Sequence, residues 1–194
     1  MAILKIRIWP DPALSEVAKP VETVDDEVRT LVTDMFETMY EANGVGLAAT
    51  QIAIPQRILI IDLDPSSDAA EHDDVAQDLV EWGFKGAQEF INPVIVEKEG
   101  SIVWDEGCLS VPGYTDQVKR AERIIVKALN RDGQEFTIDC NGLYAVAIQH
   151  EMDHLEGKVF VEYLSRLKRD VVKRKMNRLK SSGIDDGVEA AANL

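Results

Sequence analysis

Residues 149–154 read Gln-His-Glu-Met-Asp-His, which places two histidines four positions apart with Glu151 directly after the first. Positions i and i+4 share one face of an α-helix, so a helix here would let His150 and His154 bind one metal ion. Glu151 would lie about 100° further round that helix, where it can reach the open side of the metal without being a ligand. The segment therefore predicts a helix on which a metal activates water beside a general base. The alternative is a helix whose polar residues are spaced this way by chance.

Two histidines are too few for a catalytic metal site, which usually has three protein ligands. The chain offers two cysteines as the third ligand. Cys140 ends an apolar run typical of a β-strand, where a free cysteine is most often a small core residue. Cys108 lies in a glycine-containing turn at residues 106–110, from which a thiolate can face a cleft. Cys108, His150 and His154 would form a site with a fourth position free for water.

A third segment, residues 44–51, follows an amphipathic helix and fits the same site. Its glycines, Gly44 and Gly46, allow the backbone to approach a ligand closely. The segment lacks the lysine and the spacing of a phosphate-binding loop. We interpret it as a loop that clamps a substrate, with the Gln51 amide as a donor to an oxyanion.

Residues 44–51, 106–110 and 149–154 together resemble the three signature motifs of bacterial peptide deformylase, in that family's order and near its spacing. The resemblance extends from about residue 3 to about residue 180, so we expect one catalytic domain over 1–180 and a flexible tail over 181–194. Two departures stand out. Residues 64–88 resemble an acidic insertion in a connection that many members keep shorter, and the run after Ser110 lacks an arginine that some members carry.

The resemblance implies removal of the formyl group from N-formylmethionine on newly made proteins by one divalent metal, typically Fe²⁺, with Zn²⁺, Ni²⁺ or Co²⁺ also accepted. Glu151 would transfer protons, while the Gln51 amide and the Leu109 backbone N–H would stabilise the oxyanion. The residues expected to bind the substrate are Gly44, Val45, Gly46, Leu109, Leu143, Val146 and Ala147. Packing in the core is an equally good interpretation of the apolar ones. Glu106 and Arg120 match an ion pair that supports the cysteine turn, although a surface pair of little energetic value is the alternative.

Two other functions are compatible with parts of the pattern. A zinc peptidase with an H-E-x-x-H helix usually takes its third ligand from downstream, but Glu156 is too close and Glu162 begins another segment. A relative that binds formyl peptides without turnover would not need both Gln51 and Glu151. We therefore favour the hydrolase.

The formal net charge of −14 argues against general nucleic-acid binding. The charge is uneven, however, because basic residues cluster between Arg166 and Lys180. This basic segment is either a solvated helix face or, as the resemblance implies, a surface that docks on the ribosome. No apolar run approaches the roughly eighteen residues needed to cross a membrane. The first residues lack a signal-peptide pattern, so we expect a cytoplasmic protein.

The hydrophobic periodicity predicts an α+β fold, with antiparallel strands packed around a central metal-binding helix and one helix near each end. Expected helices start at Asp25 or Asp26, at 141–142 and at Ser165, and end near 41, 157 and 181. Expected strands cover 57–63, 90–97, 101–105, 118–129 and 134–139. The second and third flank a turn at 99–100, and the last two form a hairpin through Asp132-Gly133.

Overall fold

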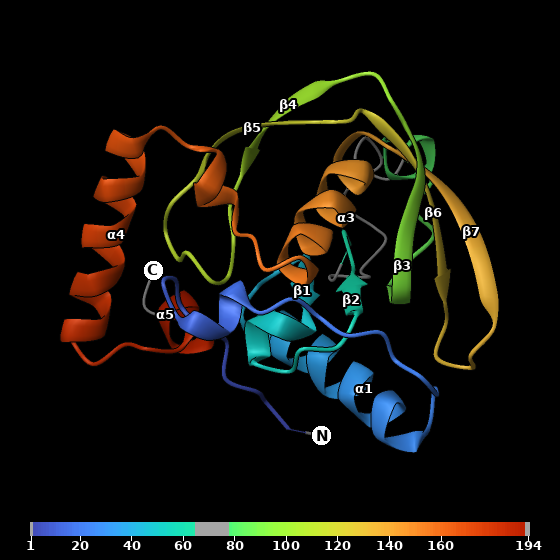
Figure 1. Ribbon diagram of the computed structural model, residues 1–194, viewed down its shortest axis with the longest axis horizontal. Coiled ribbons are helices and arrows are strands. Elements are labelled where there is room, and N and C mark those ends of the chain that lie inside the picture. The colour runs from blue at the N-terminus through green and yellow to red at the C-terminus, as the bar shows by residue number, and fades with distance from the viewer. Residues whose placement is uncertain (1, 65–77, 193–194) are drawn as a thin grey trace.

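The computed structural model describes residues 2–64 and 78–192 (Figure 1). Its strands form two antiparallel sheets, and helix α3, Gly142–Leu155, lies at the centre with strands around it. The larger sheet has the order β1-β2-β3-β6-β7, and the smaller one pairs β4 with β5. The expected α+β class is therefore confirmed.

The strands of the larger sheet are β1 Gly46–Ala48, β2 Ile58–Ile61, β3 Gln88–Glu99, β6 Arg123–Leu129 and β7 Glu135–Asn141. The smaller sheet consists of β4 Ile102–Glu106 and β5 Asp116–Arg120. Strands β6 and β7 form the hairpin that was predicted from the Asp-Gly turn.

Strand β2 is buried on both faces and joins two hydrophobic cores. Leu59 and Ile61 belong to the core that includes α3, whereas Ile58 and Ile60 belong to the core against helix α1. Because successive side chains of a strand point to opposite faces, one four-residue strand supplies both layers. Each such side chain contributes roughly 1.5–3 kcal/mol when it is fully buried.

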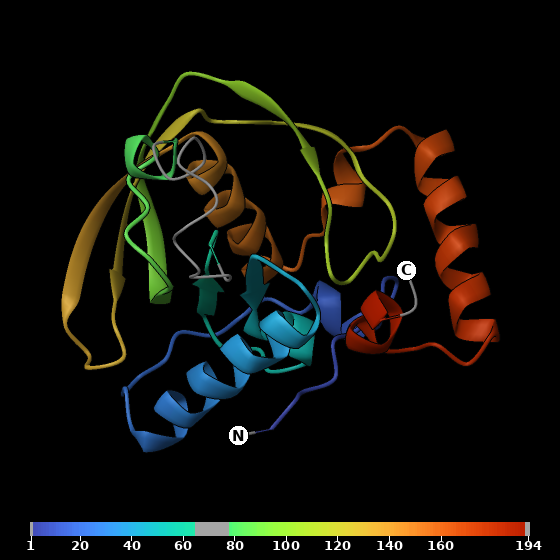
Figure 2. The same ribbon diagram turned by 180° about the vertical axis from the view of Figure 1, so that it is seen from behind.

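The three predicted helices are present, and the first and last of them begin at the expected capping residues. Helix α1, Asp26–Glu41, begins after Asp25, whose carboxylate accepts the Val28 N–H. The helix lies beside β1 and β2 (Figure 2), and its apolar stripe is buried in the core that it shares with them. Helix α4, Arg166–Ser181, begins after the Ser165 cap. Short 3₁₀ turns cover Pro12–Ser15, Ala49–Ile52 and Phe160–Tyr163.

The strand expected over 118–129 is instead two strands in different sheets, β5 and β6. The break falls at Ala121, whose backbone N–H and carbonyl pair with the Gln149 side chain. The Gln149 amide accepts the Ala121 N–H at 3.1 Å and donates to the Ala121 carbonyl at 2.9 Å. Strand β4 pairs with β5, whereas β3, which precedes β4 across the turn at 99–100, pairs with β6.

Two segments expected to be exposed or flexible contain ordered structure that packs on the core. Of the 64–88 insertion, residues 65–77 lie outside the described residues, but Leu79 and Phe84 are each only 7% exposed. Within the expected tail, helix α5 covers Gly187–Ala192, and Ala190 is buried. The Gly187 N–H donates to the Ile6 carbonyl at 2.9 Å, so the end of the chain packs beside its beginning.

Within residues 2–64 and 78–192, no helix combines the length and the apolar character needed to span a membrane.

Candidate metal centre and substrate pocket

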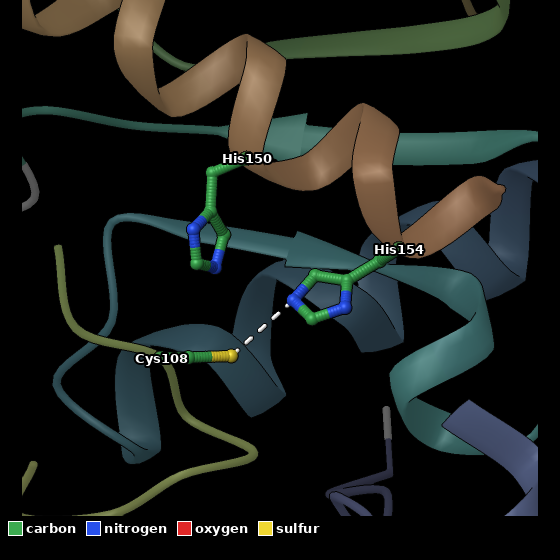
Figure 3. Close-up of side chains that lie close together, drawn as sticks. All are labelled: Cys108, His150 and His154. Atoms are coloured by element: carbon green, nitrogen blue, oxygen red, sulfur yellow. Dashed lines mark hydrogen bonds between the residues drawn. The ribbon is translucent and has the colours of Figure 1, made fainter. Parts of the chain in front are cut away.

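Three potential metal ligands from two parts of the chain meet at one point. His150 and His154 project from one side of α3, and Cys108 reaches them from the loop that joins β4 to β5 (Figure 3). Their ligand atoms all lie within 4.8 Å of one another. Cys108 Sγ is 3.2 Å from His154 Nε2. The structure therefore brings together the three residues that the sequence predicted as ligands.

The surroundings of these three side chains suit a divalent transition metal. His150 Nδ1 lies 2.7 Å from Glu106 Oε2 and donates its proton there, which leaves the Nε2 lone pair for a metal. Burial lowers the pKa of His154 well below its ordinary value, so this ring is neutral as a ligand must be. Cys108 Sγ accepts the Ser110 N–H at 3.4 Å and the Gln51 amide N–H at 3.6 Å. One sulfur and two imidazole nitrogens fit iron and zinc alike.

A buried arginine, Arg120, holds Glu106 in place just before the turn that carries Cys108. Arg120 Nε donates to Glu106 Oε1 at 2.6 Å, and Arg120 Nη2 donates to Glu106 Oε2 at 2.9 Å. Burial alone would raise the pKa of the Glu106 carboxyl, but hydrogen bonds from Arg120 and His150 outweigh it and hold that pKa below its usual range. Both partners are almost fully buried, so the interpretation as a surface pair is wrong.

The sequence did not indicate the outer part of this network. Arg120 also donates to Asp153 Oδ2, and the Tyr163 hydroxyl donates to the same oxygen at 2.8 Å. The Tyr163 ring lies 5.0 Å from the Arg120 guanidinium carbon. Asp153 was visible only as a carboxylate next to a ligand, and nothing in the spacing connects it to Tyr163.

Glu151 is a buried acidic residue that lines the same cavity as Cys108 and His150. Its Oε2 has no hydrogen-bond partner among the described residues, and burial raises the pKa of the carboxyl to about 7. A Cβ atom at Gly46 would lie 2.6 Å from Glu151 Oε1, so only glycine lets strand β1 pass so close. A carboxyl whose pKa is near neutral pH is well suited to accept and return a proton.

A cavity of about 490 Å³ opens beside these groups. All residues expected to form the substrate pocket line it, together with Cys108, His150 and Glu151. These are Gly44, Val45, Gly46, Leu109, Leu143, Val146 and Ala147. The further lining residues that the sequence did not indicate include Trp104, Tyr114, Gly187 and Ala191. The last two belong to α5, whose position depends on packing against the first residues of the chain.

Gln51 lies at the edge of the site and is almost completely buried. Its Oε1 accepts the Ala48 N–H at 2.8 Å, which orients the amide nitrogen toward Cys108 and Ser110. The segment predicted to clamp a substrate therefore places its amide next to the Cys108 sulfur.

A Cys-His-His cluster, a buried carboxylate and an apolar cavity on an α+β scaffold define a metal-dependent hydrolase. Residues 3–170 match the model of the family described as polypeptide deformylase. The chain belongs to the polypeptide deformylase family.

Known relatives agree with this placement over nearly their whole length. The chain is 50% identical to a peptide deformylase of Neisseria gonorrhoeae over 178 residues, which cover 92% of this chain and 96% of the relative. A crystal structure of a peptide deformylase from Legionella pneumophila superposes with a TM-score of 0.82 at 44% identity, covering 94% of this chain and 98% of that one.

A peptide deformylase from Ehrlichia chaffeensis, solved in complex with actinonin, has a TM-score of 0.81 at 40% identity. The match covers 92% of this chain and 98% of that one. The chain is thus an enzyme, and its reaction is the removal of the formyl group from N-formylmethionine of newly made proteins.

Proposed function

We propose that Cys108, His150 and His154 hold one divalent metal, Fe²⁺ in the native enzyme, and that Glu151 is the proton carrier of the deformylation. The donor set of one thiolate and two imidazoles also admits Zn²⁺, Ni²⁺ or Co²⁺. When bound, the metal supplies Lewis acidity, which lowers the pKa of a water molecule and polarises the formyl oxygen. The observation that carries the proposal is the buried Glu151 carboxyl group beside the ligand cluster, whose Oε2 has no hydrogen-bond partner within residues 2–64 and 78–192.

Glu151 takes a proton from water as the water oxygen adds to the formyl carbon. It then returns the proton to the amine nitrogen as the carbon–nitrogen bond breaks, which releases formate and a free N-terminus. The Leu109 backbone N–H and the Gln51 amide are the proposed donors to the oxygen that gains negative charge. Each such donor is typically worth about 3–4 kcal/mol of barrier.

The lining of the cavity suits a substrate in which a small acyl group is joined to a methionine. The Gly46 backbone lies so close to Glu151 that an added Cβ atom would be 2.6 Å from Glu151 Oε1. The space beside the carboxylate therefore suits a formyl group better than a larger acyl group. Val45, Leu143 and Val146 give the cavity apolar walls for an unbranched side chain. Ala147 adds little bulk on the same helix.

Hydrolysis of formyl-Met-Ala-Ser tests this function directly. We expect stoichiometric release of formate and of Met-Ala-Ser, with no cleavage of acetyl-Met-Ala-Ser under the same conditions. Release of an internal fragment would instead identify a peptidase. Binding of the formyl peptide without any product would identify a non-catalytic binder.

We also propose that α4 docks the enzyme on the ribosome, close to where its substrates emerge. Because these substrates are newly made chains, we place the enzyme in the cytoplasm. Helix α4 lies at the periphery of the molecule (Figure 1). It turns Val172 and Met176 into the core and leaves most of its charged side chains exposed. Its basic residues are Arg166, Lys168, Arg169, Lys173, Arg174, Lys175, Arg178 and Lys180.

Charge reversal on α4 separates docking from catalysis. We expect Lys173→Glu, Arg174→Glu and Arg178→Glu together to weaken co-sedimentation with ribosomes at low salt roughly tenfold, because contacts to phosphates depend on charge. Hydrolysis of formyl-Met-Ala-Ser should stay within about twofold. Truncating α4 would be a poorer test, since α5 follows it and lines the cavity. Unchanged co-sedimentation, or an equal loss after the matched reversals Lys98→Glu, Lys119→Glu and Lys127→Glu, would contradict the proposal.

A further inference from the structure

Residues 78–88, the return limb of the insertion, bring Trp82 to the start of the metal-binding helix. The Trp82 carbonyl accepts the Asn141 N–H at 3.0 Å, immediately before α3. The Trp82 ring covers Gly142, where an added Cβ would lie 2.3 Å from Trp82 Nε1. Gly142 has φ +52°, so both its backbone and the indole require glycine at this position.

The same indole also supports a wall of the cavity. Trp82 and Trp104 meet edge to face, with ring centroids 6.3 Å apart and planes at 88°. Trp104 lines the cavity, and Leu143, which directly follows Gly142, lines it too. The Trp82 side chain therefore contacts Trp104 and Gly142, the residue before Leu143. Trp104 and Leu143, which both line the cavity, are thus near the start of α3.

The return limb is anchored firmly enough to hold Trp82 in place. Leu79 and Phe84 flank it in sequence and are both buried in the core that contains α3. The Phe84 ring meets the Tyr144 ring edge to face at 5.3 Å. Such aromatic pairs contribute about 0.5–1.5 kcal/mol beyond the area they bury.

We propose that Trp82 is a positioning residue for the methionine pocket, acting through Trp104 and through the first turn of α3. This inference rests on the proposed function, because it assigns the cavity to the methionine side chain. His150, Glu151 and His154 lie more than two turns further along α3, and Cys108 lies in the loop after β4, so we expect these groups to stay in place when the indole is removed. Removing the indole should therefore loosen the pocket and leave the reacting groups in position.

Trp82→Ala should raise KM for formyl-Met-Ala-Ser about tenfold, the effect of a modest loss of apolar contact. We expect kcat to stay within about twofold and bound metal to stay unchanged. The preference for formyl-Met-Ala-Ser over formyl-Ala-Ala-Ser, as a ratio of kcat/KM values, should fall by a similar factor of about ten. Trp82→Phe, which keeps an aromatic edge for Trp104, should recover much of that preference. Val80→Ala, at a neighbouring side chain that is 74% exposed, is the matched control and should change none of these values.

A general role in folding would give a different pattern. In that case Trp82→Ala would lower kcat and metal content together and leave the substrate preference intact, which would overturn the proposal. Unchanged kinetics in Trp82→Ala would overturn it as well. If Trp82→Ala does not fold, the same measurements on Trp82→Phe and Trp82→Leu decide, with a larger loss of preference expected for Leu. The native enzyme is the reference throughout: if it releases no formate, the proposed function itself fails, whereas activity with an unaltered preference rejects only the role of Trp82.

Discussion

Replacing Glu151 with Gln should lower kcat on formyl-Met-Ala-Ser by about 10²–10⁴, the contribution typical of a general acid–base group. Gln has nearly the same shape but cannot accept the proton, and Glu151 is not among the three side chains that converge as ligands. Bound metal should therefore remain near one ion per chain. Steady-state kinetics together with metal analysis of the purified variant provide the measurement.

The pH profile offers a second readout of the same substitution. Burial raises the pKa of Glu151 to about 7, and the base must be deprotonated to act. The activity of the native enzyme should rise with pH through about 7 and then level off, and Glu151→Gln should lose this limb. Glu156→Gln, just past the end of the same helix and far more exposed, is the matched control. A Glu151→Gln enzyme that keeps most of its activity would show that another group carries the proton.

Replacing Cys108 with Ala should lower metal affinity by about a hundredfold or more. Mutation of a residue that only hydrogen-bonds to a metal ligand already lowers metal affinity by about 10–100-fold, and loss of a ligand itself should cost more. Cys140→Ala provides the control within the same chain. Cys140 is completely buried, and burial raises the pKa of its thiol to about 12, so it remains a neutral core side chain. Metal content measured after anaerobic purification should separate the two variants, and it also identifies the native ion. Equal metal loss from both would contradict the ligand assignment.

Local sequence was enough to predict the helix over 142–155 and the three potential ligands that the structure brings together. Two constraints coincide at residues 142–155, namely the four-residue spacing of the histidines and the apolar run before them. Cys108 could be chosen over Cys140 because one lies in a glycine turn and the other ends a strand. These features depend on neighbours in the sequence, so no tertiary information was needed.

The features that the sequence did not reveal all depend on distant contacts. The strand break at Ala121 requires the Gln149 side chain from α3. The return limb looked like part of an acidic loop, although Leu79 and Phe84 enter a core whose other members come mainly from α3 and from several strands of the larger sheet. Helix α5 is short and rich in small residues, so its place on the cavity wall depends on packing against Ile6 rather than on its own propensity.

The buried Glu151 carboxylate also affects the stability of the whole molecule. Its pKa of about 7 lies above the ordinary 4.5, so the folded chain holds this proton more tightly than the unfolded chain does. The free energy of unfolding should consequently decrease as the pH rises from about 4.5 to about 7, and the cost above that range is on the order of 3 kcal/mol. That is a large fraction of the roughly 5–15 kcal/mol by which domains are usually stable. A cation that binds only the folded chain offsets this cost by mass action. We therefore expect metal supply to set how long the protein survives proteolysis, as well as how fast it turns over substrate.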